Sequence, residues 1–149
     1  MNTVHVRDAK KSDLEKIKSL VIELIDAVNN TEGINIDAVT RNCESTLDNK
    51  NSHFLVAEIN DSVICFINFT IRETILHSAP SGLIDDLVVS KDHRGKGVGR
   101  KLVQVAIEKC KQLGCCEVEV STELSNINAR KFYKKMGFKE KGLLFEMDL

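Results

Sequence analysis

The sequence predicts a three-layer α/β/α domain, with a mixed central sheet of six or seven strands and about four helices. Segments with strand periodicity and segments with helical periodicity follow one another along the chain in the order β-α-α-β-β-β-α-β-α-β. The length of 149 residues suits one domain, expected to span 1–149, around one hydrophobic core. Hydrophobic residues make up 42% of the chain and charged residues 29%, as in a soluble globular protein.

The residue patterns in the first half of the chain predict a strand, two helices and then three strands. Ser12 and Glu15 have the spacing of a capping box at the start of the first helix. Its apolar residues keep helical spacing as far as the segment 29–33, which ends the helix. Asn60 and Asp61 separate two strands and predict a hairpin turn. The expected elements are a strand at 4–7, helices at 14–28 and 36–47, and strands at 53–59, 62–75 and 83–89.

In the second half, glycines mark where helices end. Gly114 stops an expected helix, and Gly137 stops the next one. The expected elements are helices at 97–113 and 126–137, a strand at 116–121, and a final strand or hairpin in 138–149 around Gly142.

Composition makes several classes of function improbable. The net charge of −1 gives no overall attraction to nucleic acid or to an anionic membrane. No apolar run approaches the roughly 18 residues that span a bilayer, and the first residues lack a signal-peptide pattern, so we expect a cytoplasmic protein. The five cysteines form no C-x-x-C pair, and the histidines have no ligand spacing. We therefore expect buried thiols and no metal site.

The stretch HRGKGVGRKL at 93–102 places three glycines among basic residues where a helix begins. Glycine lets the backbone approach a ligand closely, and a helix start offers unpaired N–H groups and partial positive charge. Together these features predict a phosphate site. Neither the Walker pattern nor the dinucleotide fingerprint fits, because Arg100 stands where each requires its last glycine.

Two signatures resemble the GCN5-related N-acetyltransferase (GNAT) superfamily. R-x-x-G-x-G, at 94–99, resembles its loop for the pyrophosphate of acetyl-coenzyme A. NINARKFYKKMGF, at 126–138, resembles its second signature, N-x-x-A-x-x-F-Y-x-x-x-G-F. The two cover about 83–138, and the order of elements is similar to that of the family over the whole chain.

The resemblance implies acetyl-coenzyme A as co-substrate. It implies that main-chain amides at 95–100 bind the pyrophosphate and that the edge of the strand 83–89 pairs with pantetheine. A main-chain N–H around Leu87 or Val88 would also support the oxyanion. The implied cofactor-binding residues are Leu87, Val88, Val89, Arg94, Gly95, Lys96, Gly97, Val98, Gly99, Arg100, Asn126, Ala129 and Tyr133.

The implied chemistry is direct attack of an amine on the thioester in a ternary complex. Tyr133, the single tyrosine, matches the family's general acid for the departing thiolate. Asp85 and Asp86 interrupt an apolar strand, and successive strand residues point to opposite faces, so one should face the cleft. Asp85 matches the family's glutamate base. Asp86, or solvent with no dedicated base, is the alternative.

The acceptor is less well defined by the sequence. Residues 23–61 carry eight acids against two bases, which suits a small cationic amine such as a polyamine or an aminoglycoside. LIDDLVVSKDHRGKGVG also resembles the diamine and polyamine group of the family locally. A protein N-terminus or lysine is an alternative acceptor, and an acyl-coenzyme A binding module without catalysis is an alternative function. A free sheet edge near the C-terminus would allow a homodimer.

Overall fold

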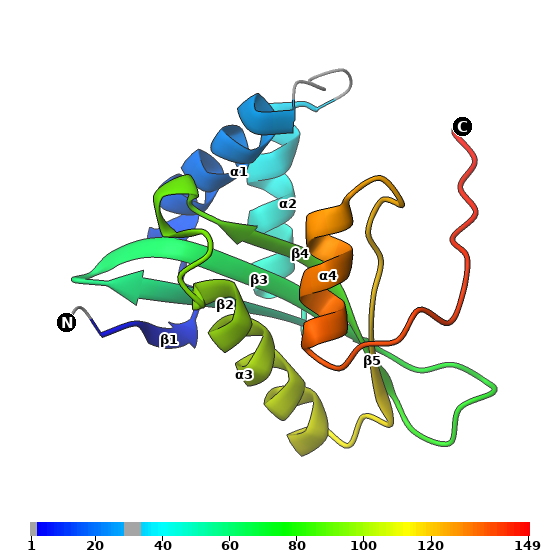
Figure 1. Ribbon diagram of the computed structural model, residues 1–149. Helices are drawn as coiled ribbons and strands as arrows, with labels where there is room; N and C mark the ends of the chain where they lie inside the picture. Colours follow the sequence, from blue (N-terminus) through cyan, green and yellow to red (C-terminus); the bar gives the residue numbers. More distant parts are fainter. Residues whose placement is uncertain (1–2, 29–33) are drawn as a thin grey trace. The chain divides into compact units, whose positions relative to one another are not determined.

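The computed structural model describes residues 3–28 and 34–149 of the chain (Figure 1). The segment 29–33, expected to end the first helix, lies outside the described residues. The chain divides into two compact units, Met1–Glu119 and Val120–Leu149. The expectation of a single domain over 1–149 stays a prediction.

A five-stranded sheet organises the first unit, in the order β1-β2-β3-β4-β5. The first four strands are antiparallel neighbours. Helix α3 connects β4 to β5, and a helical crossover is the connection that parallel neighbours require. The strands are β1 His5–Asp8, β2 Ser52–Ile59, β3 Ser62–Arg72, β4 Ser81–Val89 and β5 Glu117–Val120.

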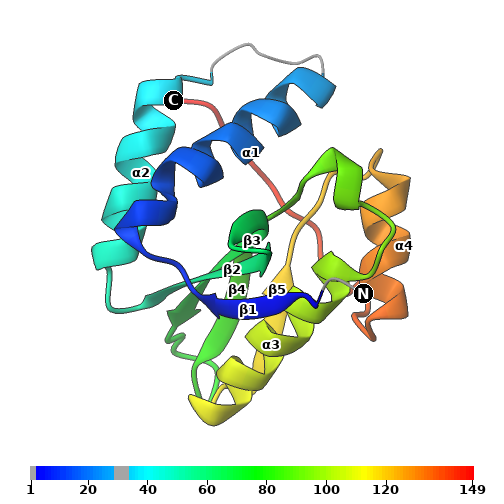
Figure 2. The same ribbon diagram turned by 90° about the vertical axis from the view of Figure 1, so that its left-hand side faces the viewer.

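Helices cover both faces of this sheet, which confirms the three-layer α/β class (Figures 1 and 2). Ile17 and Leu20 of α1 pack with Phe66 of β3 and Val88 of β4, and α2 adds partly buried apolar residues. Alternation along β3 turns Ile67 to the opposite face, where α3 packs. The helices are η1 Lys11–Asp13, α1 Leu14–Val28, α2 Ile36–Asp48, η2 Lys91–His93 and α3 Val98–Gln112.

The expected hairpin turn between β2 and β3 is confirmed. Asn60 and Asp61 have φ angles of 49° and 61°. Two consecutive residues with positive φ match the right-handed twist of a two-residue hairpin, and asparagine and aspartate tolerate this conformation.

The predicted capping box at Ser12 and Glu15 is wrong, because the helical segment begins earlier, at η1. A carboxylate oxygen of Asp13 accepts a hydrogen bond of 2.8 Å from the backbone N–H of Lys10. Arg7 holds the same carboxylate through two further bonds of 2.8 and 3.0 Å. An ion pair with the preceding strand β1 therefore helps to set where this segment starts, and spacing within the segment does not reveal it.

A β-bulge in β4 alters the expected directions of the two aspartates. Asn68 pairs with Asp86 while the next residue, Phe69, pairs with Ile84, so Asp85 is the extra residue. Asn68 and Thr70 share one face of β3, and they bond Asp86 and Asp85 respectively. Both carboxylates therefore reach the same face, and the expectation of opposite faces is wrong.

The second unit contains α4, Ile127–Lys135, followed by a segment without regular structure. Gly137 has a φ of 96°, which ends the helix close to the expected position. The final strand or hairpin expected in 138–149 is not formed in the described chain, which has five strands instead of six or seven. Its alternating apolar residues need a neighbouring strand, and none of the described strands pairs with it.

Candidate active site

The glycine-rich loop enters α3 through two residues in the left-handed region. Gly95 has a φ of 72° and Gly97, the N-cap of α3, a φ of 81°. A Cβ atom built on either would meet no other atom within 4 Å. The protein itself therefore leaves room at these positions, and backbone conformation is the reason for glycine there.

The start of α3 presents backbone donors. Its first helical hydrogen bond runs from the N–H of Lys101 to the carbonyl of Gly97, at 3.0 Å. The N–H groups of Val98, Gly99 and Arg100 precede that bond and have no acceptor inside the helix. This arrangement, with the helix dipole behind it, can bind an anion of the size of a phosphate.

Two of the basic side chains around this loop are engaged within the protein. Nε of Arg94 donates to the carbonyl of Val89 at 3.0 Å, and its guanidinium lies 3.9 Å from Glu23. Nζ of Lys101 donates to the carbonyl of Val4. Lys96 and Arg100 are exposed and have no hydrogen-bond partner among the described residues. Main-chain N–H groups are therefore the main hydrogen-bond donors that this loop can offer to a phosphate.

The C-terminal half of β4 has an edge that β5 does not cover. The N–H of Cys116, just before β5, bonds the carbonyl of Pro80, just before β4, at 2.9 Å. β5 has four residues and β4 has nine. Parallel neighbouring strands rise by the same distance per residue. The four residues of β5 therefore end before they reach the level of Leu87–Val89 in β4. These three residues pair with β3 on one side. On the other side β5 does not reach them, and the carbonyl of Val89 accepts the bond from Arg94.

The two aspartates of β4 occupy different environments. Thr70 donates a hydrogen bond of 2.6 Å from its hydroxyl to Asp85. Asn68 donates from its amide nitrogen to Asp86 at 3.4 Å. Burial raises the pKa of Asp86, and the charge of Asp85 raises it further, while the bond from Asn68 lowers it. Asp86 is therefore the carboxylate whose affinity for a proton is increased.

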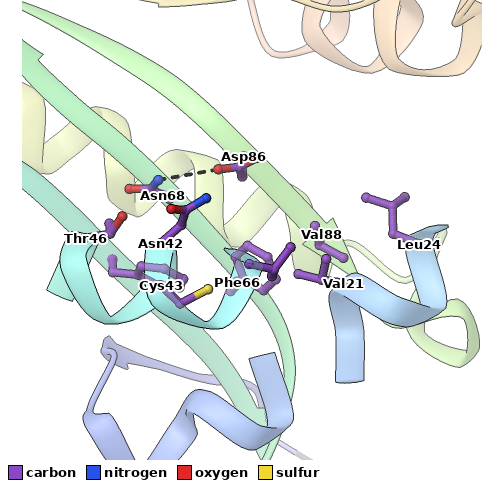
Figure 3. A pocket seen from close by; sticks show the side chains of 11 residues that line it. Val21, Leu24, Asn42, Cys43, Thr46, Phe66, Asn68, Asp86 and Val88 are labelled. Carbon is purple, nitrogen blue, oxygen red and sulfur yellow. Dashed lines mark hydrogen bonds between the residues drawn. The ribbon is translucent and has the colours of Figure 1, made fainter. Parts of the chain in front are cut away.

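A pocket of about 200 Å³ opens beside Asp86, between α1, α2 and the sheet (Figure 3). Asn42, Thr46, Asn68 and Asp86 supply its polar groups, and its other walls are apolar apart from one thiol. Asp85 is not among the lining residues. The lining residues are Val21, Leu24, Val39, Asn42, Cys43, Thr46, Phe54, Phe66, Asn68, Asp86 and Val88.

Sequence reasoning missed the polar residues that α2 and β3 contribute to this pocket. Asn68 interrupts the apolar strand β3 just as the two aspartates interrupt β4, so the same signal could have identified it. Asn42 and Thr46 lie one helical turn apart on α2, and only the fold shows that their side faces β4. None of the described acids in 23–61 lines the pocket.

The second unit holds Tyr133, Asn126 and Ala129. The Tyr133 ring lies edge-on to Phe132 and Phe138, with centroid distances of 5.1 and 5.5 Å. Burial raises the pKa of its phenol to about 12, so the group keeps its proton at neutral pH. The side-chain oxygen of Asn126 accepts the N–H of Ala129 at 3.0 Å, which makes Asn126 the N-cap of α4.

All five cysteines are free thiols. Burial raises the pKa of Cys65 and that of Cys110 to about 12, and it also raises the pKa of Cys43 in the pocket. Protonated thiols are poor nucleophiles. No set of three or more His, Cys, Asp and Glu side chains in the described chain could hold a metal ion. None of the helices in residues 3–28 and 34–149 is long and apolar enough to span a membrane.

A helix start that can bind a phosphate, beside a strand that its neighbour covers only in part, on a three-layer α/β fold, is the arrangement expected of an enzyme that transfers acyl groups from coenzyme A. Comparison with known families agrees: residues 21–138 match the model of the acetyltransferase (GNAT) family. The chain belongs to that family, and it is an acyltransferase that acts on amines with acetyl-coenzyme A as donor.

Two relatives and a solved structure match nearly the whole chain. The aminoalkylphosphonate N-acetyltransferase of Salmonella typhimurium is 26% identical over 145 residues, which are 97% of this chain and 91% of that protein. The thialysine N-epsilon-acetyltransferase of Sus scrofa is 24% identical over 94% of this chain and 86% of its own. The structure of AAC(6')-Iy in complex with a bisubstrate analogue superposes with a TM-score of 0.84 and covers 99% of both chains at 22% identity, which is a likeness of fold.

Proposed function

We propose that this protein acetylates the primary amine of a small molecule, by direct attack on acetyl-coenzyme A in a ternary complex. The observation that carries the proposal is the start of α3, where Gly95 and Gly97 adopt positive φ with free space around them and unpaired N–H groups follow. A pyrophosphate fits this donor set, since it needs several N–H donors and close backbone approach.

The loop and β4 bind different parts of the co-substrate. Main-chain amides at 95–100 bind the pyrophosphate, and the exposed Lys96 and Arg100 add positive charge. Arg94 acts indirectly, because its guanidinium holds the loop against Val89. The uncovered backbone of Leu87–Val89 pairs with the two amides of pantetheine as a strand would. In the second unit, the side-chain nitrogen of Asn126 stays available to the co-substrate, because capping uses only its oxygen.

The chemistry needs a base for the amine and an acid for the thiolate. We assign the base to Asp86, because it faces the pocket and its pKa is raised, while Asp85 is held by Thr70 outside the lining. The amine nitrogen bonds the acetyl carbon and its proton passes to Asp86, directly or through water. A main-chain N–H near Leu87 or Val88 stabilises the oxyanion. The carbon–sulfur bond then breaks, and Tyr133 gives the thiolate its proton.

A small amine is the acceptor that this site suits best. The relatives named above include enzymes for an aminoalkylphosphonate and for thialysine, both small molecules with a primary amine. The pocket of about 200 Å³ lies below the roughly 300–1,000 Å³ of sites that enclose drug-sized ligands. It suits one amine-bearing arm. A protein N-terminus or lysine as acceptor, and binding without catalysis, are outcomes of the test below.

The setting of the enzyme is also part of the proposal. We place it in the cytoplasm, where acetyl-coenzyme A is made and used, and we propose that two copies form a homodimer. The support for pairing is the C-terminal segment, whose large apolar side chains are exposed.

Calorimetry with coenzyme A and acetyl-coenzyme A, followed by a thiol-release assay over a panel of amines, tests the proposal. We expect the protein to bind both coenzyme A and acetyl-coenzyme A, and we expect turnover to require a primary amine of low molecular weight. Turnover with peptides alone would make the enzyme a protein acetyltransferase. Binding without turnover on any amine would favour the regulatory module, and no binding of either nucleotide would overturn the proposal.

A further inference from the structure

The segment that leads from β4 into the glycine-rich loop is held by a side chain of α1. After β4 the chain turns toward α1 before it enters α3 (Figure 1). A carboxylate oxygen of Glu23, in the second half of α1, accepts a hydrogen bond from the backbone N–H of Lys91. The same carboxylate lies 3.9 Å from the guanidinium of Arg94. Among the described residues, Glu23 is the single side chain from outside residues 89–97 that makes a polar contact with them.

Arg94 connects this contact to the end of β4. Its Nε donates to the carbonyl of Val89 at 3.0 Å, while another nitrogen of the same guanidinium faces Glu23. The turn from Val89 to Arg94 is thereby attached both to α1 and to β4. Gly95, with its φ of 72°, follows directly. Glu23 therefore helps to set where the glycine-rich loop begins.

Helix α1 is itself held firmly to the sheet. Ile17 and Leu20 are buried in the core that α1 forms with β3 and β4, and Ile25 is buried as well. The side chain of Glu23 is 29% exposed, and an ion pair that meets solvent adds little to stability. The contact is therefore better suited to placing the loop than to stabilising the protein. A loop held in its binding conformation needs less ordering when the ligand arrives.

The negative charge of Glu23, taken alone, opposes the binding of an anion. A carboxylate close to a phosphate site repels the phosphate, so a neutral side chain in its place should by charge alone favour binding. Its oxygen has the contrary effect if the bond from Lys91 holds the loop in place. Loss of the charge and loss of the oxygen are therefore expected to change coenzyme A affinity in opposite directions.

We propose that Glu23 is a positioning residue for the co-substrate, whose carboxylate oxygen, by accepting the N–H of Lys91, holds the glycine-rich loop in the conformation that binds the pyrophosphate. This inference rests on the proposed function, to which it adds a residue outside both the loop and the pocket. Val21 and Leu24, near Glu23 on α1, line the pocket, so one helix supports both binding regions.

Two variants of Glu23 separate the oxygen from the charge. Glu23→Gln keeps an oxygen that can accept the N–H of Lys91 and loses the charge, whereas Glu23→Leu loses both. By calorimetry we expect Glu23→Leu to bind coenzyme A about tenfold more weakly than wild type. We expect Glu23→Gln to bind it within about threefold of wild type, or more tightly. The control Asp26→Leu makes the same change at an exposed acid of the same helix and should leave the affinity unchanged.

Hydrogen exchange in the protein without ligand tests the position of the loop directly. In Glu23→Leu the amides of residues 90–97 should exchange faster than in wild type, while those of β3 keep their protection. Glu23→Gln should restore the slower exchange. A merely structural role of Glu23 would instead speed exchange throughout α1 and lower the melting temperature.

The outcomes separate this inference from the proposed function. Equal or tighter coenzyme A binding in Glu23→Leu, equal loss in both variants, or unchanged exchange at 90–97 would overturn the positioning role. Should Glu23→Leu fail to fold, Glu23→Ala lacks the same oxygen and takes its place in the comparison. Wild-type protein that binds no coenzyme A would refute the proposed function instead, and the exchange measurement would still test the contact.

Discussion

The phenol of Tyr133 combines two properties that suit a proton donor. Its pKa of about 12 keeps the proton in place at working pH, and its ring is fixed between two phenylalanines. We expect Tyr133→Phe to lower kcat by roughly 100-fold or more, the usual range for losing a general acid. The ring contacts remain, so thermal stability should change little. Phe132→Leu is the control: it should lower stability more than turnover. Unchanged kcat at saturating amine would remove the acid role.

The two aspartates of β4 should behave differently when each is replaced by asparagine. A base must be ionised, so activity should fall as pH drops through the raised pKa of Asp86. Asp86→Asn should abolish that acidic limb and lower kcat/KM by about 100-fold or more. Asp85→Asn should retain the limb. Initial rates from pH 5 to 9 make the comparison, and loss of the limb in Asp85→Asn alone would move the base to Asp85.

Stability provides an independent check on Asp86. A carboxyl group whose pKa is raised by folding stabilises the protein below its unfolded pKa and loses that contribution as pH rises through the folded pKa. At neutral pH the ionised Asp86 is therefore a cost. We expect Asp86→Asn to melt at the same or a higher temperature than wild type while being less active. A lower melting temperature at neutral pH would contradict the direction of the shift.

Individual residues also show how far sequence reasoning reached. Charged residues inside an apolar strand identified Asp85 and Asp86, because a carboxylate at such a position needs a partner or water. Their relative directions could not be predicted, because a bulge depends on pairing between β3 and β4 and leaves no local signature.

At the scale of elements, α3 offers a matched pair of glycines at its two ends. Gly97 and Gly114 have φ angles of 81° and 79°, and neither would crowd a neighbour with a Cβ. Alanine should cost similar backbone strain at both, about 1 kcal/mol. Gly97→Ala should in addition weaken coenzyme A binding by about tenfold or more, since its Cβ meets the phosphate. Calorimetry and thermal melting together decide. Equal coenzyme A affinity in the two variants would mean that Gly97 serves the helix start alone.

The beginning of the first helical segment is held by an ion pair that should respond to acid. The hydrogen bonds from Arg7 hold the pKa of Asp13 below its usual range, so this carboxylate stabilises the protein above its unfolded pKa. That contribution is lost as pH falls through the depressed pKa. Asp13→Asn should cost about 1–3 kcal/mol at pH 7 and much less at pH 2–3. Asp48→Asn breaks an exposed pair with Lys11 and should cost under about 0.5 kcal/mol. Urea titrations at both pH values test this, and an equal cost at both would contradict it.

At the scale of the whole molecule, the spacing of hydrophobic residues along the sequence was enough to predict the layers of the fold. Amphipathic helices and alternating strands must bury their apolar faces together, and that requirement leaves few architectures. The number of strands could not be predicted in this way. A segment with strand periodicity becomes a strand only when another pairs with it, and residues 138–149 have no such partner in the described chain.

That C-terminal segment supports the last prediction, which concerns assembly. Leu143, Phe145 and Met147 are exposed and alternate with Leu144 and the charged Glu146. An exposed strand-like segment with one apolar face is suited to pair with a sheet edge of a second copy. Sedimentation should show a dimer at micromolar concentration. Changing both Leu143 and Phe145 to glutamate should shift it to monomer, because each dimer contact would bury new charges, whereas Glu146→Lys on the opposite face should leave the dimer. Wild-type protein that sediments as a monomer at high concentration would refute the pairing, and the segment would then have no role in dimerisation.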